Sequence, residues 1–240
     1  MRLGLGAEAR ATDYYDEGSL SVACYDAMTA ANDAAIRGDI AFYAALGARS
    51  YLELGCGTGR VSHALAEMGR EVVGLDLSAP MLRTARDKGD GATFLHGDMT
   101  DFRLEQRFEA VIVPFFGFAH VPPDGRAAAL LNMATHLKPG GVIALHMPTE
   151  AALRTPAHGR PLARAGEVTL YMPRIDATPP RFDFHAEYRT PRGVSVERLT
   201  YWLGPLDAPG LKRRTRPFGA GGEMHLIRCE RSAKGKSPGR

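Results

Sequence analysis

Between residues 50 and 148 the chain alternates short apolar runs with stretches of helical periodicity. The run at 110–113, Ala-Val-Ile-Val, is apolar throughout, as a strand buried on both faces should be. This alternation predicts an α/β fold with a parallel sheet covered by helices on both faces. The expected strands lie near 50–54, 71–76, 93–96, 110–113 and 142–145.

Each helix predicted between these strands presents one apolar face. The apolar positions are, in chain order, Val61, Leu65 and Met68, then Met81, Leu82 and Ala85, then Leu130, Ala134 and Leu137. Ser78 is placed to cap the second helix, with Pro80 at its second position. The third helix is expected at about 124–137, and Lys138-Pro139-Gly140-Gly141 should end it sharply.

After residue 150 the pattern becomes that of antiparallel strands. The segments 182–188 and 194–200 alternate in polarity and are joined by Pro191-Arg192-Gly193, which predicts a hairpin. Two prolines within 204–210 block a helix there, so a short connection to strands near 211–217 and 223–229 is expected.

These patterns divide the chain into three parts. Residues 1–49 read as helices, with Ile40, Tyr43 and Leu46 as a buried stripe. Residues 50–230 form the core. A β insertion at about 165–203 could cover the side of the core where a substrate would bind, or it could form a dimer surface. Residues 231–240 are basic, contain no acid, and are expected to be a disordered tail.

Composition narrows the possible partners. The chain has 240 residues and a net charge of +3, too mild to indicate nucleic acid as a partner. The three cysteines are widely spaced, which indicates neither a disulfide framework nor a metal site. No apolar run approaches the roughly 20 residues of a membrane span, and acidic residues stand where a signal peptide needs an apolar core. We therefore expect a cytoplasmic protein, monomeric or homodimeric, that does not bind a membrane.

The most informative motif follows the first predicted strand. Glu53 precedes a loop with glycines at 55, 57 and 59, where a missing Cβ lets the backbone approach a ligand. Asp76 ends the next strand, from which a carboxylate can accept hydrogen bonds from both hydroxyls of a ribose. Together these residues predict a nucleoside-binding crevice.

The spacing of the glycines bears on which nucleoside is bound. A dinucleotide-binding loop needs G-x-G-x-x-G, but here the third glycine is one residue early and Arg60 stands in the last position. The loop instead resembles the first motif of the class I S-adenosylmethionine-dependent methyltransferases, E/D-x-G-x-G-x-G. The resemblance spans about residues 50–148 and includes five motifs in order. It implies a Rossmann-like, seven-stranded, mostly parallel sheet, and S-adenosylmethionine as cofactor.

The resemblance also implies a role for individual residues. The methionine part of the cofactor would lie on the first motif, the ribose at the second strand, the adenine between apolar side chains and the third motif, and the methyl group at the fourth. The residues at the methionine part would be Glu53, Gly55, Cys56, Gly57 and Gly59, and the residue at the ribose would be Asp76. The adenine would lie between Leu77 and Met81, next to Gly97, Asp98 and Met99 of the third motif. Pro114 and Phe115 would lie at the methyl group. Cys56 is read as an inert filler between glycines, and Met81 could equally be plain core.

Two further positions concern the transfer itself. His120, just past the fourth strand, is the candidate general base, although it could instead cap the next helix or hydrogen-bond locally. The resemblance implies that the amino-terminal helices, residues 1–49, form a cap over the cofactor. The family often reaches its cofactor with a tyrosine from these helices, and we assign this place to Tyr15, with Tyr14 and Tyr25 as alternatives.

The predicted function is methyl transfer to an oxygen or nitrogen of a small-molecule acceptor. The fourth motif lacks the N-P-P-Y or D-P-P-Y of enzymes that methylate nucleic-acid bases. A second hypothesis is a catalytically silent module that binds S-adenosylmethionine for regulation or partner binding. A third, an NAD-dependent dehydrogenase, is disfavoured by Arg60 and the Asp98 motif.

Overall fold

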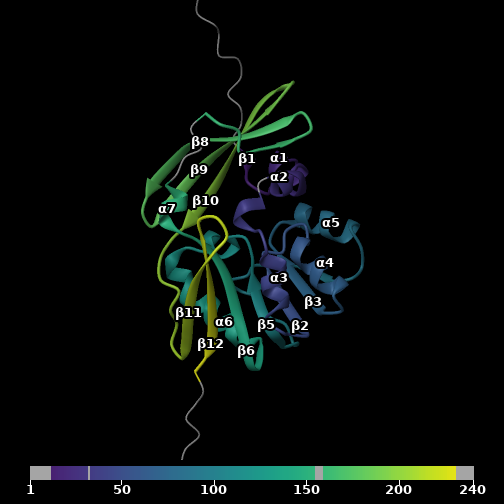
Figure 1. Ribbon diagram of the computed structural model, residues 1–240, viewed down its shortest axis with the longest axis vertical. Helices are drawn as coiled ribbons and strands as arrows, with labels where there is room; N and C mark the ends of the chain where they lie inside the picture. The colour runs from purple at the N-terminus through teal and green to yellow at the C-terminus, as the bar shows by residue number, and fades with distance from the viewer. Residues whose placement is uncertain (1–11, 32, 155–158, 231–240) are drawn as a thin grey trace, which may run out of the picture.

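The computed structural model describes residues 12–31, 33–154 and 159–230, which form two β-sheets (Figure 1). The larger sheet has seven strands in the order β11-β12-β6-β5-β2-β3-β4. Its strands, in chain order, are β2 (Ser50–Leu54), β3 (Glu71–Asp76), β4 (Thr93–His96), β5 (Phe108–Val113), β6 (Leu137–Pro148), β11 (Leu211–Phe218) and β12 (Gly222–Cys229). The neighbouring strands β6, β5, β2, β3 and β4 pair in parallel, whereas β12 pairs antiparallel with both β6 and β11. This arrangement confirms the predicted sheet.

Side-chain alternation along the strands gives the larger sheet two apolar faces. Leu52, Val111 and Ile143 face α6 (Pro123–Thr135), whereas Tyr51 and Ile112 face α3 (Asp39–Ala44) and α4 (Arg60–Glu67). The remaining core helix, α5 (Ala79–Asp87), packs on Phe94 of β4 and on the glycine loop. Helices therefore cover both faces, as predicted.

Two helix predictions need correction. Met68 is 51% exposed, because α4 ends at Glu67 and the i+7 position lies beyond its last turn. The third helix ends at Thr135, and Leu137 belongs to β6. The reason is backbone pairing: Phe108 N donates to His136 O at 2.8 Å, so strand hydrogen bonding begins where the last helical turn was expected. The capping prediction for α5 is confirmed, since Ser78 Oγ accepts from Met81 N.

The smaller sheet has the strand order β1-β10-β9-β8-β7 and is drawn mainly in green above the larger one in Figure 1. Its strands are β1 (Thr12–Asp13), β7 (Ala163–Ala165), β8 (Val168–Thr178), β9 (Arg181–Thr190) and β10 (Gly193–Trp202). The predicted hairpin is the β9–β10 pair, with Gly193 opposite Thr190. The sheet is larger than that hairpin, and β1 comes from the amino-terminal segment that we expected to be helical.

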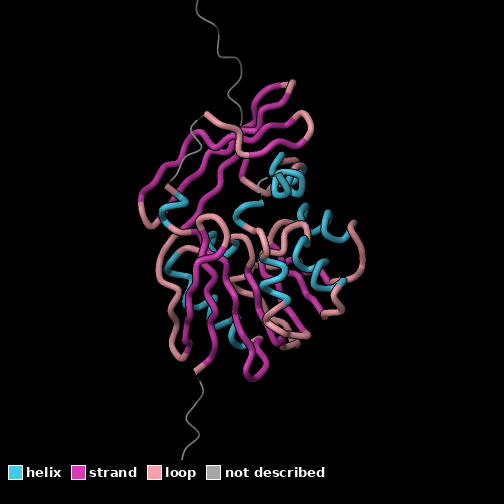
Figure 2. Tube along the Cα trace, in the orientation of Figure 1, coloured by secondary structure: helices cyan, strands magenta, loops and turns pink. Residues whose placement is uncertain are grey.

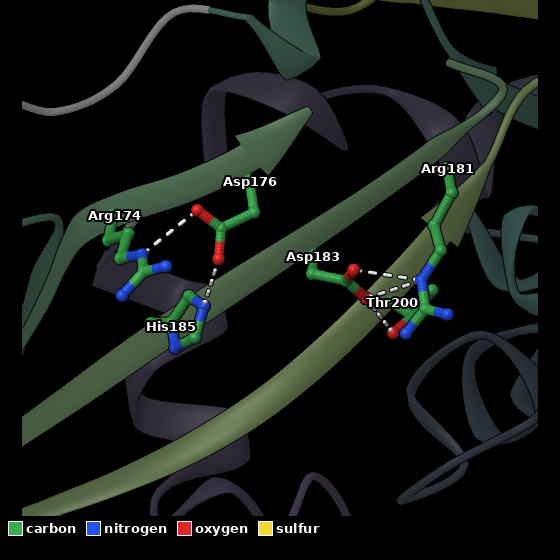
Figure 3. Close-up of polar contacts among 6 residues, drawn as sticks. All are labelled: Arg174, Asp176, Arg181, Asp183, His185 and Thr200. Atoms are coloured by element: carbon green, nitrogen blue, oxygen red, sulfur yellow. Dashed lines mark hydrogen bonds and ion pairs between the residues drawn. The ribbon is translucent and has the colours of Figure 1, made fainter. Parts of the chain in front are cut away.

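The two faces of the smaller sheet differ in polarity. Figure 3 shows one face, where Arg174 and His185 contact Asp176, and Arg181 and Thr200 contact Asp183. The other face is apolar and packs on the amino-terminal segment. Its residues include Phe182, Phe184, Ala186, Tyr188 and Leu199. The small sheet therefore turns its apolar face inwards.

Two short helices, α1 (Leu20–Ala23) and α2 (Tyr25–Ala31), are the purple helices beside the smaller sheet in Figure 1. Met28 of α2 packs against Ala186 and Tyr188. We call residues 14–31 the lid. Among the described residues of the predicted cap, the lid reaches the carboxyl ends of the strands, whereas α3 packs on a face of the larger sheet.

The remaining connections are short (Figure 2). They contain η1 (Asp33–Ala35), η2 (Gly117–His120) and α7 (Glu150–Leu153). Residues 204–210 form no helix, as expected from their two prolines. The predicted tail, 231–240, lies outside the described residues. Within the described ranges, no helix is long and apolar enough to cross a membrane.

Candidate functional site

A cavity of about 600 Å³ opens at the carboxyl ends of β2, β3 and β5. The lid and β10 form its opposite wall. Strand β2 pairs with β3 on one side and β5 on the other, so the connections that leave the sheet here diverge. Such a switch in strand order is where open α/β sheets bind ligands.

The glycine loop presents bare backbone to this cavity. Gly55 and Gly57 have φ of +68° and +54°, and Gly55 N donates to Leu75 O at 2.8 Å. A Cβ on Gly57 would meet nothing closer than Tyr25 Cε1 at 4.0 Å, so the space beside this residue is open to a ligand. The loop is thus a cradle that side chains would fill.

Asp76 is held at the end of β3 by two main-chain donors. Gly57 N donates to its Oδ2 at 2.7 Å and Ser78 N to its Oδ1 at 2.8 Å. Burial raises the pKa of Asp76, and these hydrogen bonds oppose the rise. Each carboxylate oxygen has a second lone pair, so Asp76 can still accept hydrogen bonds from a ribose.

Glu53 lies on the α4 face of the sheet because it alternates with Leu52 and Leu54. Its carboxyl accepts a hydrogen bond from Ser62 Oγ of α4, and the residue is only 2% exposed. Burial raises the pKa of Glu53 to about 8, and the Ser62 hydrogen bond opposes the rise. A neighbouring cationic ligand group would favour its charged form.

Two apolar side chains that follow Asp76 in the chain, Leu77 and Met81, also line the cavity. Leu77 is 64% exposed at the cavity mouth, while Met81 is buried in the wall. Met81 therefore lines the cavity and belongs to the core at once. Asp98 accepts from Thr100 N and Thr100 Oγ1 at one oxygen, Oδ1, in a tight turn.

The end of β5 carries unusual backbone. Phe115 and Phe116 have positive φ, 42° and 64°, which is uncommon for residues other than glycine and clusters at functional sites. Phe115 lines the cavity, whereas the Phe116 ring packs 4.5 Å from His146. Phe118 is fully buried core. Of Phe115, Phe116 and Phe118, only Phe115 lines the cavity.

His120 lines the cavity between the core and the smaller sheet. Its ring lies 5.0 Å from that of Tyr201 and 6.1 Å from that of Tyr15. Burial lowers the pKa of His120 to about 4, partly offset by a hydrogen bond to the Thr200 backbone. The imidazole is therefore neutral at pH 7 and is a weak base.

The lid adds a cluster of tyrosines. The Tyr15 ring lies 4.6 Å from that of Tyr14 and 6.0 Å from that of Tyr25, and all three residues line the cavity. Tyr188 Oη donates to Tyr14 Oη at 3.0 Å. Burial raises the pKa values of Tyr15 and Tyr25 well above the usual value, so both phenols stay protonated.

Every predicted site residue except Gly59 lines this one cavity. Gly59, with φ of +77°, precedes α4, and a Cβ there would come within 2.8 Å of Phe94 Cζ. Its role is close packing.

Sequence reasoning missed lining residues outside the motifs. Val121 and Pro122 adjoin His120 and could have been found by adjacency. Residues 198–200 come from β10, and no local motif marks them. Thr200 uses its hydroxyl to bind Asp183 on the outer face of that sheet.

Comparison with known proteins agrees with this geometry. Residues 52–141 match a family model described as a methyltransferase domain. Over 97 residues the chain is 42% identical to the dTDP-3-amino-3,6-dideoxy-alpha-D-glucopyranose N,N-dimethyltransferase of Streptomyces fradiae, covering 40% of this chain and 38% of that protein. Over 98 residues it is 41% identical to the dTDP-3-amino-3,4,6-trideoxy-alpha-D-glucopyranose N,N-dimethyltransferase of Streptomyces venezuelae, covering 40% and 41%.

The matched segment spans about two fifths of these curated relatives. The fold is similar over a longer range to the CcbJ methyltransferase from Streptomyces caelestis, with a TM-score of 0.76 and 22% identity. That similarity covers 91% of this chain and 99% of the other. Residues 52–141 therefore match a methyltransferase domain in sequence, and over most of its length the chain has a fold similar to that of a solved methyltransferase.

Proposed function

We propose that this protein transfers a methyl group from S-adenosylmethionine to an amine nitrogen of a small molecule. The observation that carries the proposal is Asp76, fixed by two N–H groups beside the bare backbone of Gly57 in a 600 Å³ cavity. When bound, S-adenosylmethionine supplies a methyl group on a sulfonium sulfur, and the bond to the acceptor forms as the sulfur–methyl bond breaks.

The donor half of the cavity fits that molecule. Asp76 would accept from the ribose hydroxyls, and Glu53 would accept from the aminoacyl ammonium group. Leu77 and Met81 would hold the adenine, with Asp98 at its amino group. These assignments use every polar wall residue of the predicted motifs, and the glycine backbone leaves the space that the ligand needs.

The acceptor half favours nitrogen over oxygen. Beside Arg198, Leu199 and Thr200 of β10, its lining includes the aromatic side chains of Tyr15, Tyr25, Phe115 and His120, and aromatic faces attract a group that becomes cationic. The two Streptomyces relatives are named as N,N-dimethyltransferases of amino sugars, which supports an amine acceptor. A hydroxyl acceptor would need a base, and the neutral His120 with its low pKa is a weak one.

The chain's residues would then act mainly by position. An amine that enters uncharged needs no base before transfer, and the charge that develops on nitrogen faces aromatic rings and phenol oxygens. The proton of the product amine leaves to water afterwards. Holding donor and acceptor in line is worth several orders of magnitude in rate.

Calorimetry with S-adenosylmethionine and its demethylated product, S-adenosylhomocysteine, tests the donor site. Asp76→Ala should weaken binding by about tenfold or more, because it removes acceptors for two hydroxyls. Asp90→Ala, at an exposed loop position outside the cavity, is the matched control. Absence of binding by the parent protein would overturn the proposal.

Methyl-labelled donor incubated with amino sugars, other small amines and phenols tests the acceptor. Transfer to an amine and not to a phenol is expected. Transfer confined to hydroxyls would refute the choice of nitrogen, whereas any transfer excludes the silent binding module.

A further inference from the structure

Glu197 is a buried carboxylate that the proposed transfer does not use. It lies in the middle of β10, is 0% exposed, and does not line the cavity. One oxygen accepts from Leu20 N at 2.6 Å, and both oxygens lie 3.2–3.3 Å from Ser21 N. A carboxylate withdrawn from water needs such donors, and these come from the first turn of α1.

From Ser21 the contacts continue to the cofactor site. Ser21 Oγ accepts from Tyr15 N at 2.9 Å, and Tyr15 O accepts from Ser78 Oγ at 2.7 Å. Ser78 N in turn donates to Asp76 Oδ1 at 2.8 Å. A continuous series of hydrogen bonds therefore joins Glu197 in the smaller sheet to the carboxylate that we assign to the ribose.

The series passes through a strained residue. Tyr15 has φ of +71°, a conformation that is costly for residues other than glycine and persists only where its surroundings impose it. Both main-chain groups of Tyr15 are hydrogen-bonded, the N–H to Ser21 within the lid and the carbonyl to Ser78 beside the larger sheet. Tyr14 N also donates to Arg198 O of β10 at 3.1 Å, so the strand beside Glu197 holds the chain on the other side of Tyr15 as well.

We propose that Glu197 is a positioning residue that sets the affinity for the cofactor from the smaller sheet, by holding Tyr15 against Ser78 and Asp76. The proposal rests on the proposed cofactor site. It means that the sheet on the acceptor side and the ribose site are coupled: ordering the lid on β10 completes the support of Asp76. A carboxylate that only fastened α1 would affect stability and leave cofactor affinity unchanged.

The first measurement is the dissociation constant of S-adenosylhomocysteine for the full chain. Glu197→Gln keeps the shape and one acceptor, but it turns an NH₂ group towards Leu20 N or Ser21 N. We expect binding on the order of tenfold weaker, equivalent to one charged hydrogen bond. Glu187→Gln is the matched control, since Glu187 lies on the neighbouring strand and pairs with Arg189 on the outer face.

A second variant tests the same proposal if Glu197→Gln does not fold. Ser21→Ala removes the acceptor for Tyr15 N while leaving the Glu197 side chain in place. It should also weaken binding, and hydrogen exchange at residues 14–21 should speed up in both variants. If Glu197→Gln unfolds, as circular dichroism would show, Ser21→Ala decides the question.

A double-mutant cycle separates positioning from stability. In a Ser78→Ala background the series is already broken, so Glu197→Gln should weaken S-adenosylhomocysteine binding no further, although it should still lower the melting temperature. The proposal is overturned if folded Glu197→Gln and Ser21→Ala bind like the parent, if Glu187→Gln weakens binding equally, or if the effects of Glu197→Gln and Ser78→Ala on affinity add. Absence of binding by the parent would instead overturn the proposed function.

Discussion

Thr58 Oγ1 donates a 2.6 Å hydrogen bond to Asp26 Oδ1, which joins the glycine loop to the first turn of α2. Lys88 Nζ completes a triangle, because it lies 2.7 Å from Asp26 Oδ2 and donates to Thr58 O at 2.9 Å. Helix α2 carries Tyr25, whose ring lies next to Gly57. The lid is therefore fastened directly to the loop that would hold the methionine part of the cofactor.

Asp26→Ala should loosen this contact. Two acceptor contacts are lost at a partly exposed site, so the free energy of unfolding should fall by about 1 kcal/mol. Because the lid covers the cavity, S-adenosylhomocysteine should also dissociate faster, which stopped-flow measurements would detect. Asp33→Ala removes an exposed ion pair with Arg37 and should change neither quantity. Equal effects of the two substitutions would contradict the role of the Asp26 contact.

Cofactor binding should release a proton from Glu53. Its raised pKa, about 8, means that the free protein holds this carboxyl mostly protonated at pH 7. The ammonium group of the cofactor favours the charged form and lowers that pKa. Calorimetry of S-adenosylhomocysteine in two buffers of different ionisation enthalpy at pH 7 should show release approaching one proton, and Glu53→Gln should show none. Equal heats in both buffers for the parent would refute this.

Gly59 and Gly69 form a matched pair for stability. Their φ angles are +77° and +76°, but a Cβ at Gly59 would clash with Phe94 and His63, whereas one at Gly69 would meet nothing within 4 Å. Gly69→Ala should cost about 1–2 kcal/mol from backbone strain alone. Gly59→Ala should cost more, and urea unfolding would measure the difference. Similar values for both would show that the packing around Phe94 relaxes freely.

Acid should destabilise the fold through three histidines. Burial lowers the pKa values of His120, His146 and His225 to about 4, below the usual 6.5. Between these values the unfolded chain binds more protons than the folded one, so stability falls as pH drops from about 6.5 towards 4. Glu53 acts oppositely, since its raised pKa makes stability fall as pH rises from about 4.5 to 8.

Melting temperatures across this pH range test the balance. A decline on the acid side is expected, and His146→Phe should make it shallower, because His146 is fully buried and its burial is the main cause of its low pKa. An unchanged acid slope in His146→Phe would contradict the assignment.

Local sequence patterns predicted the larger sheet well, for a physical reason. Strands such as 71–76 and the cap at Ser78 are specified by residues close in sequence, so their bounds can be read directly. The end of α6 was misread because a long-range pairing, between Phe108 and His136, replaces the last helical turn.

The acceptor side could not be predicted in the same way. The role of β10 depends on parallel pairing with β1 and on contacts of Glu197 with Leu20, which are 177 residues apart. The glycine loop and Asp76 belong to a motif with fixed spacing, but no local pattern tells which distant strand will cover them. The positive φ of Tyr15 is likewise imposed by Ser21 and Ser78, not by the tyrosine itself.

The pairing of β1 with β10 has a consequence for the order of events during synthesis. Residues 12 and 13 leave the ribosome long before their partner residues 197 and 198 are made. The floor of the cavity, at β2, β3 and β5, lies on strands that pair with one another and with β6, which ends at residue 148. It can therefore form while the amino-terminal segment still lacks its partner strand. Because domains assemble as their contacts become available, β10 and the lid would close over the cavity only after its floor had formed, and a nascent chain would expose the proposed donor site before it had this wall.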